Sequence, residues 1–162
     1  MSKELSHMDP QNGPKMVDVS GKKTSSREAI ARGKIRVNQK ALNAIIESQN
    51  PKGDVVSTAK IAGIMSAKQT SSLIPLCHPI NLSFIDTQLT INSAENYIEI
   101  ESTVRTTEKT GVEMEALTAV SVAALTVYDM CKALDKTMVI DEIKLIKKTG
   151  GSSGSYDITN PS

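Results

Sequence analysis

The feature that most constrains the fold is an uninterrupted helical pattern that runs from Thr110 to Lys132. The segment is rich in alanine and other small residues, carries an apolar stripe, and has charged side chains only near its two ends. Apolar positions that recur with the helical period over this length predict a long amphipathic α-helix. Any architecture for this chain must therefore pack one long helix along its apolar side.

Two acidic residues on this helix have a consequence for assembly. Glu115 and Asp129 are 14 residues apart in the sequence, which corresponds to about 21 Å along an α-helix at about 1.5 Å per residue. At about 100° per residue they lie on nearly the same face. A small substrate cannot contact both on one helix. If both take part in chemistry, the site is shared between two subunits whose copies of this helix are paired.

Composition limits the partners. The 162 residues predict one domain, long enough to bury a core of its own. A net charge of +1, from 19 basic and 18 acidic residues, argues against a nucleic acid or a membrane surface bound by bulk charge. With no Trp, one Phe and three Tyr, the chain lacks the stacking platforms of single-strand binders. We expect no nucleic-acid or membrane partner and a core of aliphatic side chains.

Three features that the sequence lacks indicate the cellular compartment. Cys77 and Cys131 form no disulfide framework, which indicates a reducing environment. We see no apolar run that approaches the ~18 residues of a membrane span. The first ten residues lack the apolar core of a signal peptide. We therefore expect a cytoplasmic protein.

Alternation, helical periodicity and turn residues predict the order β-α-α-β-β-α-β. The expected elements are a strand over 27–37, a helix over 38–46 capped by Asn38, a helix over 55–70 capped by Asp54, strands over 82–92 and 97–107, the long helix, and a strand over 137–147. Thr110-x-x-Glu113 matches a capping box at the start of the long helix, which gives Glu113 a structural task and leaves Glu115 freer for function.

Without the early helix this order is β-α-β-β-α-β, the ferredoxin-like split βαβ pattern. The predicted fold class is α+β, a ferredoxin-like sandwich in which helices pack on one face of an antiparallel sheet, with one extra early helix. Residues 16–149 should form a single catalytic domain. Residues 1–15 and the Gly/Ser-rich stretch 150–162 should be flexible.

Asp129 and Lys132 are the first candidates for chemistry. Three residues apart near a helix end, they can meet on one face. They form either an ordinary surface ion pair or a paired acid and base whose pKa values are shifted by partial burial. Lys52, in the turn Pro51-Lys52-Gly53-Asp54, is exposed by default.

The segment Leu73-Ile-Pro-Leu-Cys-His-Pro-Ile80 holds two further candidates between two prolines. His78 is either a structural histidine in a rigid turn or a group that orients a ligand or transfers a proton. Cys77 reads as a packed residue rather than a nucleophile, because no partner constellation is evident. Adjacent Cys and His rarely reach one metal ion together, and HExxH, CxxC, Walker A and GxGxxG motifs are missing. We expect no metal and no cofactor.

Several motifs together resemble the molybdenum cofactor biosynthesis protein C family, the cyclic pyranopterin monophosphate synthases. They are Met16-Val-Asp-Val-Ser20, Lys52-Gly-Asp54 with Ile61-Ala-Gly63, Leu73-Ile-Pro-Leu-Cys-His-Pro79, and the segment from Lys109 to Ala133. The resemblance runs from about Ser6 to Gly154, and the long helix is its most specific part. It implies a ferredoxin-like subunit in a homo-hexamer, a trimer of dimers with active sites at the dimer interface.

The implied reaction converts 3',8-cyclo-7,8-dihydroguanosine 5'-triphosphate to cyclic pyranopterin monophosphate and pyrophosphate by general acid and base rearrangement. The resemblance assigns catalysis to Asp129, Lys132 and Lys52. It assigns substrate contacts to Leu76, Cys77, His78, Met114 and Glu115, and further polar site positions to Asp18, Arg27 and Lys148. Lysines and arginine suit a triphosphate, because its oxygens take charge-assisted hydrogen bonds.

Two departures from the family reduce local positive charge. Many relatives have Lys-Arg-Thr where this chain has Lys68-Gln-Thr70, and many have a lysine where this chain has Ser152. One alternative is therefore a catalytically silent guanine-nucleotide-binding or scaffold subunit on the same fold. Another is a generic ferredoxin-like regulatory domain, for which loss of Lys52 or Asp129 would have no functional effect.

Overall fold

The computed structural model describes residues 8–9, 13–151 and 154–159. Its elements, in chain order, are β1 (Met8–Asp9), β2 (Gly13–Pro14), β3 (Ser25–Arg36), α1 (Gln39–Ile46), α2 (Val55–Ala67), α3 (Thr70–Leu73), β4 (Phe84–Asn92), β5 (Tyr97–Glu108), α4 (Glu113–Cys131), β6 (Val139–Thr149) and β7 (Tyr156–Asp157). The long helix and the four long strands lie where alternation and periodicity predicted them, with ends shifted by a few residues.

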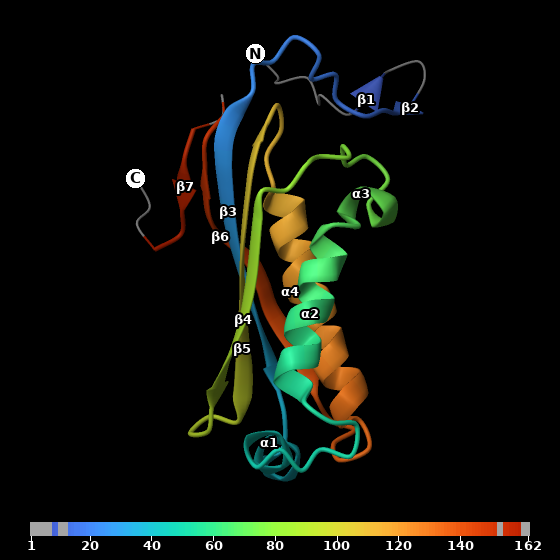
Figure 1. Ribbon diagram of the computed structural model, residues 1–162, viewed down its shortest axis with the longest axis vertical. Coiled ribbons are helices and arrows are strands. Elements are labelled where there is room, and N and C mark those ends of the chain that lie inside the picture. The colour runs from blue at the N-terminus through green and yellow to red at the C-terminus, as the bar shows by residue number, and fades with distance from the viewer. Residues whose placement is uncertain (1–7, 10–12, 152–153, 160–162) are drawn as a thin grey trace.

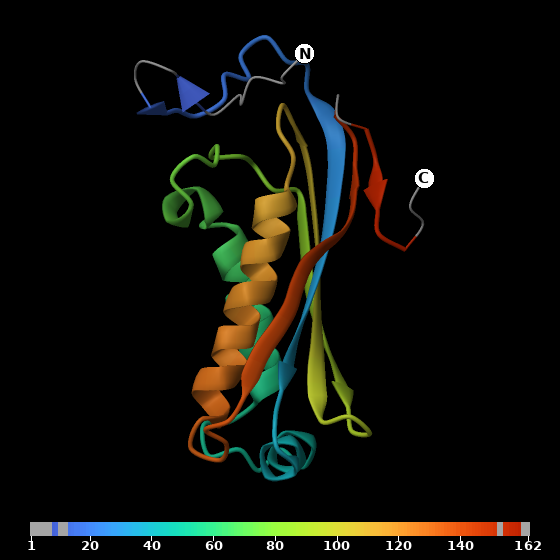
Figure 2. The same ribbon diagram turned by 180° about the vertical axis from the view of Figure 1, so that it is seen from behind.

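The main sheet has the strand order β4-β5-β3-β6-β7, and all neighbours are antiparallel. The four long strands therefore follow the ferredoxin-like arrangement, in which each βαβ crossover skips one strand position. Helices α2 and α4 lie side by side over one face of the sheet, and α1 lies near one end of the molecule (Figure 1). The view from behind shows β6 beside α4 (Figure 2). The predicted fold class is confirmed.

The core lies between this face and the two long helices. Alternate β3 residues Ala29, Ala31 and Ile35 are fully buried, and they face an apolar surface of α4 that includes Val120. Gly33 belongs to the same inward row. A Cβ there would lie 2.8 Å from Val120 Cγ1 and 2.9 Å from Ile143 Cγ1, so glycine permits the close packing of β3, α4 and β6. As predicted, the buried hydrophobic core is aliphatic.

Helix α4 also tests the expectation that the chain has no segment long and apolar enough to cross a membrane. By length and composition alone it is apolar enough to cross a membrane, so the expectation that no apolar run approaches that length was wrong. Its charged side chains are concentrated at the two ends, which leaves a long apolar window between them. In the fold 56% of this window is buried, which is typical of the core helix of a ferredoxin-like sandwich.

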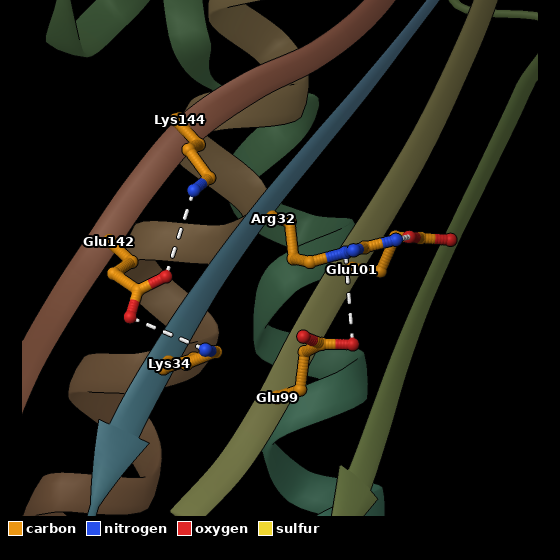
Figure 3. A network of polar contacts seen from close by, with 6 residues as sticks. All are labelled: Arg32, Lys34, Glu99, Glu101, Glu142 and Lys144. Carbon is orange, nitrogen blue, oxygen red and sulfur yellow. Dashed lines mark hydrogen bonds and ion pairs between the residues drawn. The ribbon is translucent and has the colours of Figure 1, made fainter. Parts of the chain in front are cut away.

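The other face of the sheet carries a charged network instead of a second core (Figure 3). Arg32 of β3 pairs with Glu101 of β5 at 2.6 Å and lies 3.7 Å from Glu99. Glu142 of β6 accepts from Lys34 at 3.3 Å and forms an ion pair with Lys144 at 3.6 Å. Such partly exposed pairs contribute little stability individually. Their main consequence is that the apolar core lies only on the helix side.

Two of the three predicted helix starts are confirmed. The Asn38 side chain accepts a hydrogen bond from Ala41 N at 2.8 Å, and Asp54 accepts one from Ser57 N at 3.0 Å. The capping box is wrong. Helix α4 begins at Glu113, and its N-cap is Val112, whose apolar side chain has no hydrogen-bonding group. Glu113 pairs with Lys148 instead.

The chain ends contain short ladders that the sequence did not predict. Strand β1 pairs with β2, and β7 pairs with the end of β6 through Tyr156 and Lys148. Residues 1–7, 10–12, 152–153 and 160–162, which hold much of the predicted flexible segments and the Ser152 departure, lie outside the described residues.

Candidate functional site

The candidate residues gather at the two ends of α4. Asp129, Lys132 and Lys52 meet at its C-terminal end, where the turn before α2 reaches the last turn of α4. The segment after α3, with Leu76, Cys77 and His78, meets Met114 and Glu115 at the N-terminal end. The two groups are separated by about 21 Å of helix, in agreement with the separation predicted from the sequence.

At the C-terminal end, one carboxylate is held between two ammonium groups. Lys132 Nζ lies 2.7 Å from Asp129 Oδ1 and Lys52 Nζ lies 2.8 Å from Oδ2. Lys52 Nζ also donates to the backbone oxygen of Asp129 at 2.9 Å. All three side chains are exposed, with 56% of Asp129 accessible in the single chain. The group is therefore open to a bound molecule.

The lysines set the charge of this cluster. Hydrogen bonds from Lys132 and then Lys52 lower the pKa of Asp129 to about 2, and the pair also raises the pKa of Lys132. Asp129 is therefore a carboxylate throughout the physiological pH range. A bound phosphate that attracted either lysine would weaken this stabilisation and raise the basicity of the carboxylate.

At the N-terminal end of α4 the structure has a cavity of about 430 Å³. Five predicted residues line it: Leu76, Cys77, His78, Met114 and Glu115. Residues that the sequence reasoning did not assign line it as well: Val17, Val19, Lys22, Thr110, Gly111 and Glu113. A cavity of this size with a mixed apolar and polar lining can hold a small molecule such as a nucleotide.

Glu115 is the buried acid of this cavity, with only 4% of its surface exposed. Burial raises its pKa to about 7, and the nearby charge of Glu113 acts in the same direction. The group therefore exchanges its proton near neutral pH. A carboxyl group in that state can donate a hydrogen bond as an acid or accept one as a base.

His78 and Cys77 differ in what they can do. The carbonyl oxygen of Val17 lies 2.7 Å from His78 Nε2, and because a carbonyl only accepts, Nε2 carries the proton. This contact fixes the ring against the segment before β3. Burial, and then the charge of Glu115, raises the pKa of the Cys77 thiol. A protonated, half-buried thiol agrees with a packing role and not with a thiolate nucleophile.

A cationic surface adjoins the cavity. Lys22 lines both the cavity and a second depression, which is formed with Lys23, Arg27 and Gly151. Arg27 Nε donates to Glu108 O at 2.9 Å and its NH2 group to Lys109 O at 3.1 Å, so the guanidinium is held against the end of β5. The lysine pair was visible in the sequence as Gly21-Lys22-Lys23, but nothing there linked it to Arg27.

The remaining polar candidates are tied to neighbours. Lys148 Nζ lies 3.1 Å from Glu113 Oε1, which brings the end of β6 to the cavity rim. Asp18 is not among the lining residues of the cavity, and its carboxylate accepts from Ser20 N at 2.8 Å within its own turn. That hydrogen bonding lowers the pKa of Asp18. Within the residues that the structure describes, no group of three His, Cys, Asp or Glu side chains gathers to hold a metal.

Comparison with known proteins connects this geometry to a family. The MoaC family matches residues 16–151. The chain is 55% identical to a cyclic pyranopterin monophosphate synthase of Heliobacterium modesticaldum, over 94% of this chain and 96% of the relative. It is 56% identical to one of Chloroflexus aurantiacus, over 94% of both chains, and 52% identical to one of a Roseiflexus species, over 94% of this chain and 97% of the relative. The chain belongs to the MoaC family.

Proposed function

We propose that this chain is a cyclic pyranopterin monophosphate synthase that acts in molybdenum cofactor biosynthesis. Its substrate would be the cyclic dihydroguanosine triphosphate, and its products cyclic pyranopterin monophosphate and pyrophosphate. The observation that carries the proposal is the Asp129 carboxylate between Lys132 and Lys52, in a member of a family whose curated relatives bear this name. Acids and bases in hydrogen-bond contact are what a sequence of proton transfers requires.

In this proposal the C-terminal cluster carries out proton transfer and stabilises charge. The two ammonium groups lie within 2.8 Å of Asp129 and can transfer their hydrogen bonds to a phosphate or to developing negative charge on the sugar. As they do so, the Asp129 pKa would rise from about 2 toward its ordinary value of 3.8, and the carboxylate would become a stronger base. Substrate binding itself would thus activate the acid and base pair.

The cavity at the N-terminal end would hold the guanine-derived ring. Glu115, with a pKa near 7, and the oriented ring of His78 supply polar contacts, while Leu76 and Met114 supply apolar surface. Cys77 would pack against the ring as a neutral thiol.

The cationic surface beside the cavity would bind the triphosphate. Arg27 and Lys148, with Lys22 and Lys23 nearby, are of the type that binds several phosphate oxygens, and Gly151 lets the backbone approach closely. Asp18 would then contribute by shaping the turn over this surface rather than by direct contact.

We further propose that each complete site is formed by two copies of the chain, within a homo-hexamer built as a trimer of dimers. The two candidate clusters lie too far apart on one helix to meet on a small molecule. Between them, the helix layer exposes Leu125 of α4 and Ile61 and Met65 of α2, an apolar surface of the kind that subunit interfaces cover. Antiparallel pairing of two α4 helices would bring Asp129 of one copy to Glu115 of the other.

Mixing two inactive variants tests the shared site. Asp129→Ala and Glu115→Ala chains are each expected to be inactive alone. After unfolding and refolding together, random pairing makes half of the dimers mixed, and each mixed dimer has one intact site. About a quarter of the activity of the unmodified chain should return. No return of activity, with mixed oligomers demonstrated by mass spectrometry, would place both residues in a site within one chain.

The reaction itself is tested by single-turnover conversion of the cyclic dihydroguanosine triphosphate, read as pterin fluorescence after oxidation. The unmodified chain should give product and Asp129→Ala should give none. Binding of the substrate without product in the unmodified chain would instead support the silent nucleotide-binding subunit. Gln69 and Ser152, which stand where many relatives have basic residues, are the reason to test for binding without turnover.

We also infer that the chain works in the cytoplasm as one catalytic domain over residues 16–149. Cys77 and Cys131 are free thiols, and Cys131 is buried, which suits a reducing compartment. Fractionation of cells that express a tagged chain would measure its location.

A further inference from the structure

Asn50 is a buried polar residue at the start of an exposed turn. Only 7% of its surface is accessible, whereas Pro51, Lys52 and Gly53 are exposed. Its side-chain oxygen accepts from Lys52 N at 2.9 Å. Its amide nitrogen donates to Met130 O at 3.3 Å and lies 3.6 Å from Cys131 Sγ. One side chain therefore connects the turn that carries Lys52 to the last turn of α4.

These contacts occur where α4 needs partners. The last carbonyl groups of a helix have no N–H donor within the helix, so they need hydrogen-bond donors from elsewhere. Asn50 satisfies Met130 O, and the ammonium of Lys52 satisfies the carbonyl of Asp129, the preceding residue, at 2.9 Å. Two residues of the same turn thus cap consecutive carbonyl groups of α4, and the second of them reaches the Asp129 carboxylate at the same time.

The backbone between these contacts is stiff. Pro51 fixes its own φ and restricts the conformation of Asn50 before it. Gly53 adopts φ +96° and its N–H donates to Asn50 O at 3.0 Å, which closes the turn. A lysine ammonium on a flexible four-carbon stem is placed only as well as its backbone is placed. The anchoring of Asn50 therefore decides where the Lys52 stem begins.

We propose that Asn50 is a positioning residue that holds Lys52 against Asp129 at the C-terminal end of α4. The part of this inference that concerns catalysis rests on the proposed function, in which Lys52 and Asp129 are catalytic residues. The part that concerns position does not, because the Lys52 contact is measurable in the absence of any substrate.

The carboxyl group of Asp129 reports that contact. Its titration would be followed by carbon NMR in the unmodified chain, in Asn50→Ala and in Lys52→Ala. Because Lys52 helps to keep this pKa low, the titration midpoint should rise in Asn50→Ala toward the value in Lys52→Ala. The matched control is Asn38→Ala, which also removes an asparagine that bonds two backbone groups, Ala41 N and Leu134 O. It should lower the thermal midpoint and leave the Asp129 titration unchanged.

Kinetics of the same variants test the catalytic part. Displacement of Lys52 by about 1 Å or more should lower kcat of Asn50→Ala roughly 10-fold to 100-fold, and Asn38→Ala should retain the unmodified value. Asn50→Ser keeps an acceptor for Lys52 N but is too short to reach Met130 O, so it should resemble Asn50→Ala. An Asp129 titration identical in Asn50→Ala and the unmodified chain would overturn the proposal. A raised midpoint, in a protein that makes no product in any form, would uphold the positioning role while the proposed function fails.

Discussion

The two ends of α4 carry carboxyl groups in opposite states. Glu115 is 4% exposed, and burial raises its pKa to about 7. Asp129 is 56% exposed, and two lysines lower its pKa to about 2. One helix thus presents an acid that can hold its proton at neutral pH and an acid that cannot, because desolvation dominates at one end and charge pairing at the other.

This contrast indicates how the two ends divide their work. Groups that exchange protons near the working pH make effective general acids and bases, and Glu115 already has that property in the empty cavity. Asp129 lacks it, because its lysines hold its pKa at about 2, and a lysine that turned to another anion would let this pKa rise toward the ordinary value of 3.8. In the proposed function, the N-terminal end would be ready to exchange a proton before the substrate binds, whereas the basicity of the C-terminal carboxylate would increase only when phosphates draw the lysines away. A pair of clusters with separated pKa values is a common basis for assigning acid and base roles.

The largest expected effect comes from breaking the C-terminal cluster. Lys52→Ala should lower the single-turnover rate by roughly 10²-fold to 10⁴-fold, because in the proposed function Lys52 transfers a proton and stabilises charge. Lys60→Ala is a matched control, since Lys60 has nearly the same exposed fraction, 46% against 45%, and pairs with Asp86 at 3.3 Å. Its rate should equal that of the unmodified chain. Equal losses in both variants would show a general effect of surface charge.

The next effect is on stability, at the buried end. An acid whose folded pKa is raised destabilises the fold as pH rises from its ordinary value of 4.5 to about 7, because the folded chain keeps a proton that the unfolded chain has released. The loss should be roughly 1–3 kcal/mol of unfolding free energy. Glu115→Gln cannot ionise and should lack this component of the pH dependence.

Urea unfolding over this pH range measures the difference between Glu115→Gln and the unmodified chain. The two curves should agree near pH 4.5 and diverge toward pH 7, with the variant more stable. Parallel curves would mean that Glu115 is solvated in the folded chain, and the contrast between the two ends would then disappear.

Local sequence signals predicted most of the fold. The caps at Asn38 and Asp54 and the alternation along β3 and β5 act between residues a few positions apart, so they can be read directly. The capping box failed for the opposite reason. Thr110-x-x-Glu113 satisfies the local pattern, but Glu113 pairs with Lys148, which is 35 residues away, and the helix begins three residues later than Thr110.

In the candidate site too, contacts between residues close in the sequence could be predicted, whereas contacts between distant residues could not. Asp129 and Lys132 are three residues apart, so their ion pair was one of the two interpretations that the sequence allowed. The contact between Lys52 and Asp129 spans 77 residues, and only the family resemblance brought them together. The burial of Glu115 arises where the segment after α3, the segment before β3 and the start of α4 meet. No periodicity encodes such a meeting of three segments, so the shifted pKa could not be predicted.

The smallest expected effect is that of Asp129→Asn on stability. A lowered pKa gives stability that is present above the ordinary value of 3.8 and is lost as pH falls toward about 2, so at neutral pH the ion pairs are fully formed. They are exposed and screened by solvent and salt, so the thermal midpoint of a single folded chain should hardly change, and any difference should vanish at high salt. A large, salt-resistant loss of stability in the assembled protein would mean that a second copy covers Asp129. The exposed end would then be buried by assembly, and its carboxylate would work in an environment closer to that of Glu115.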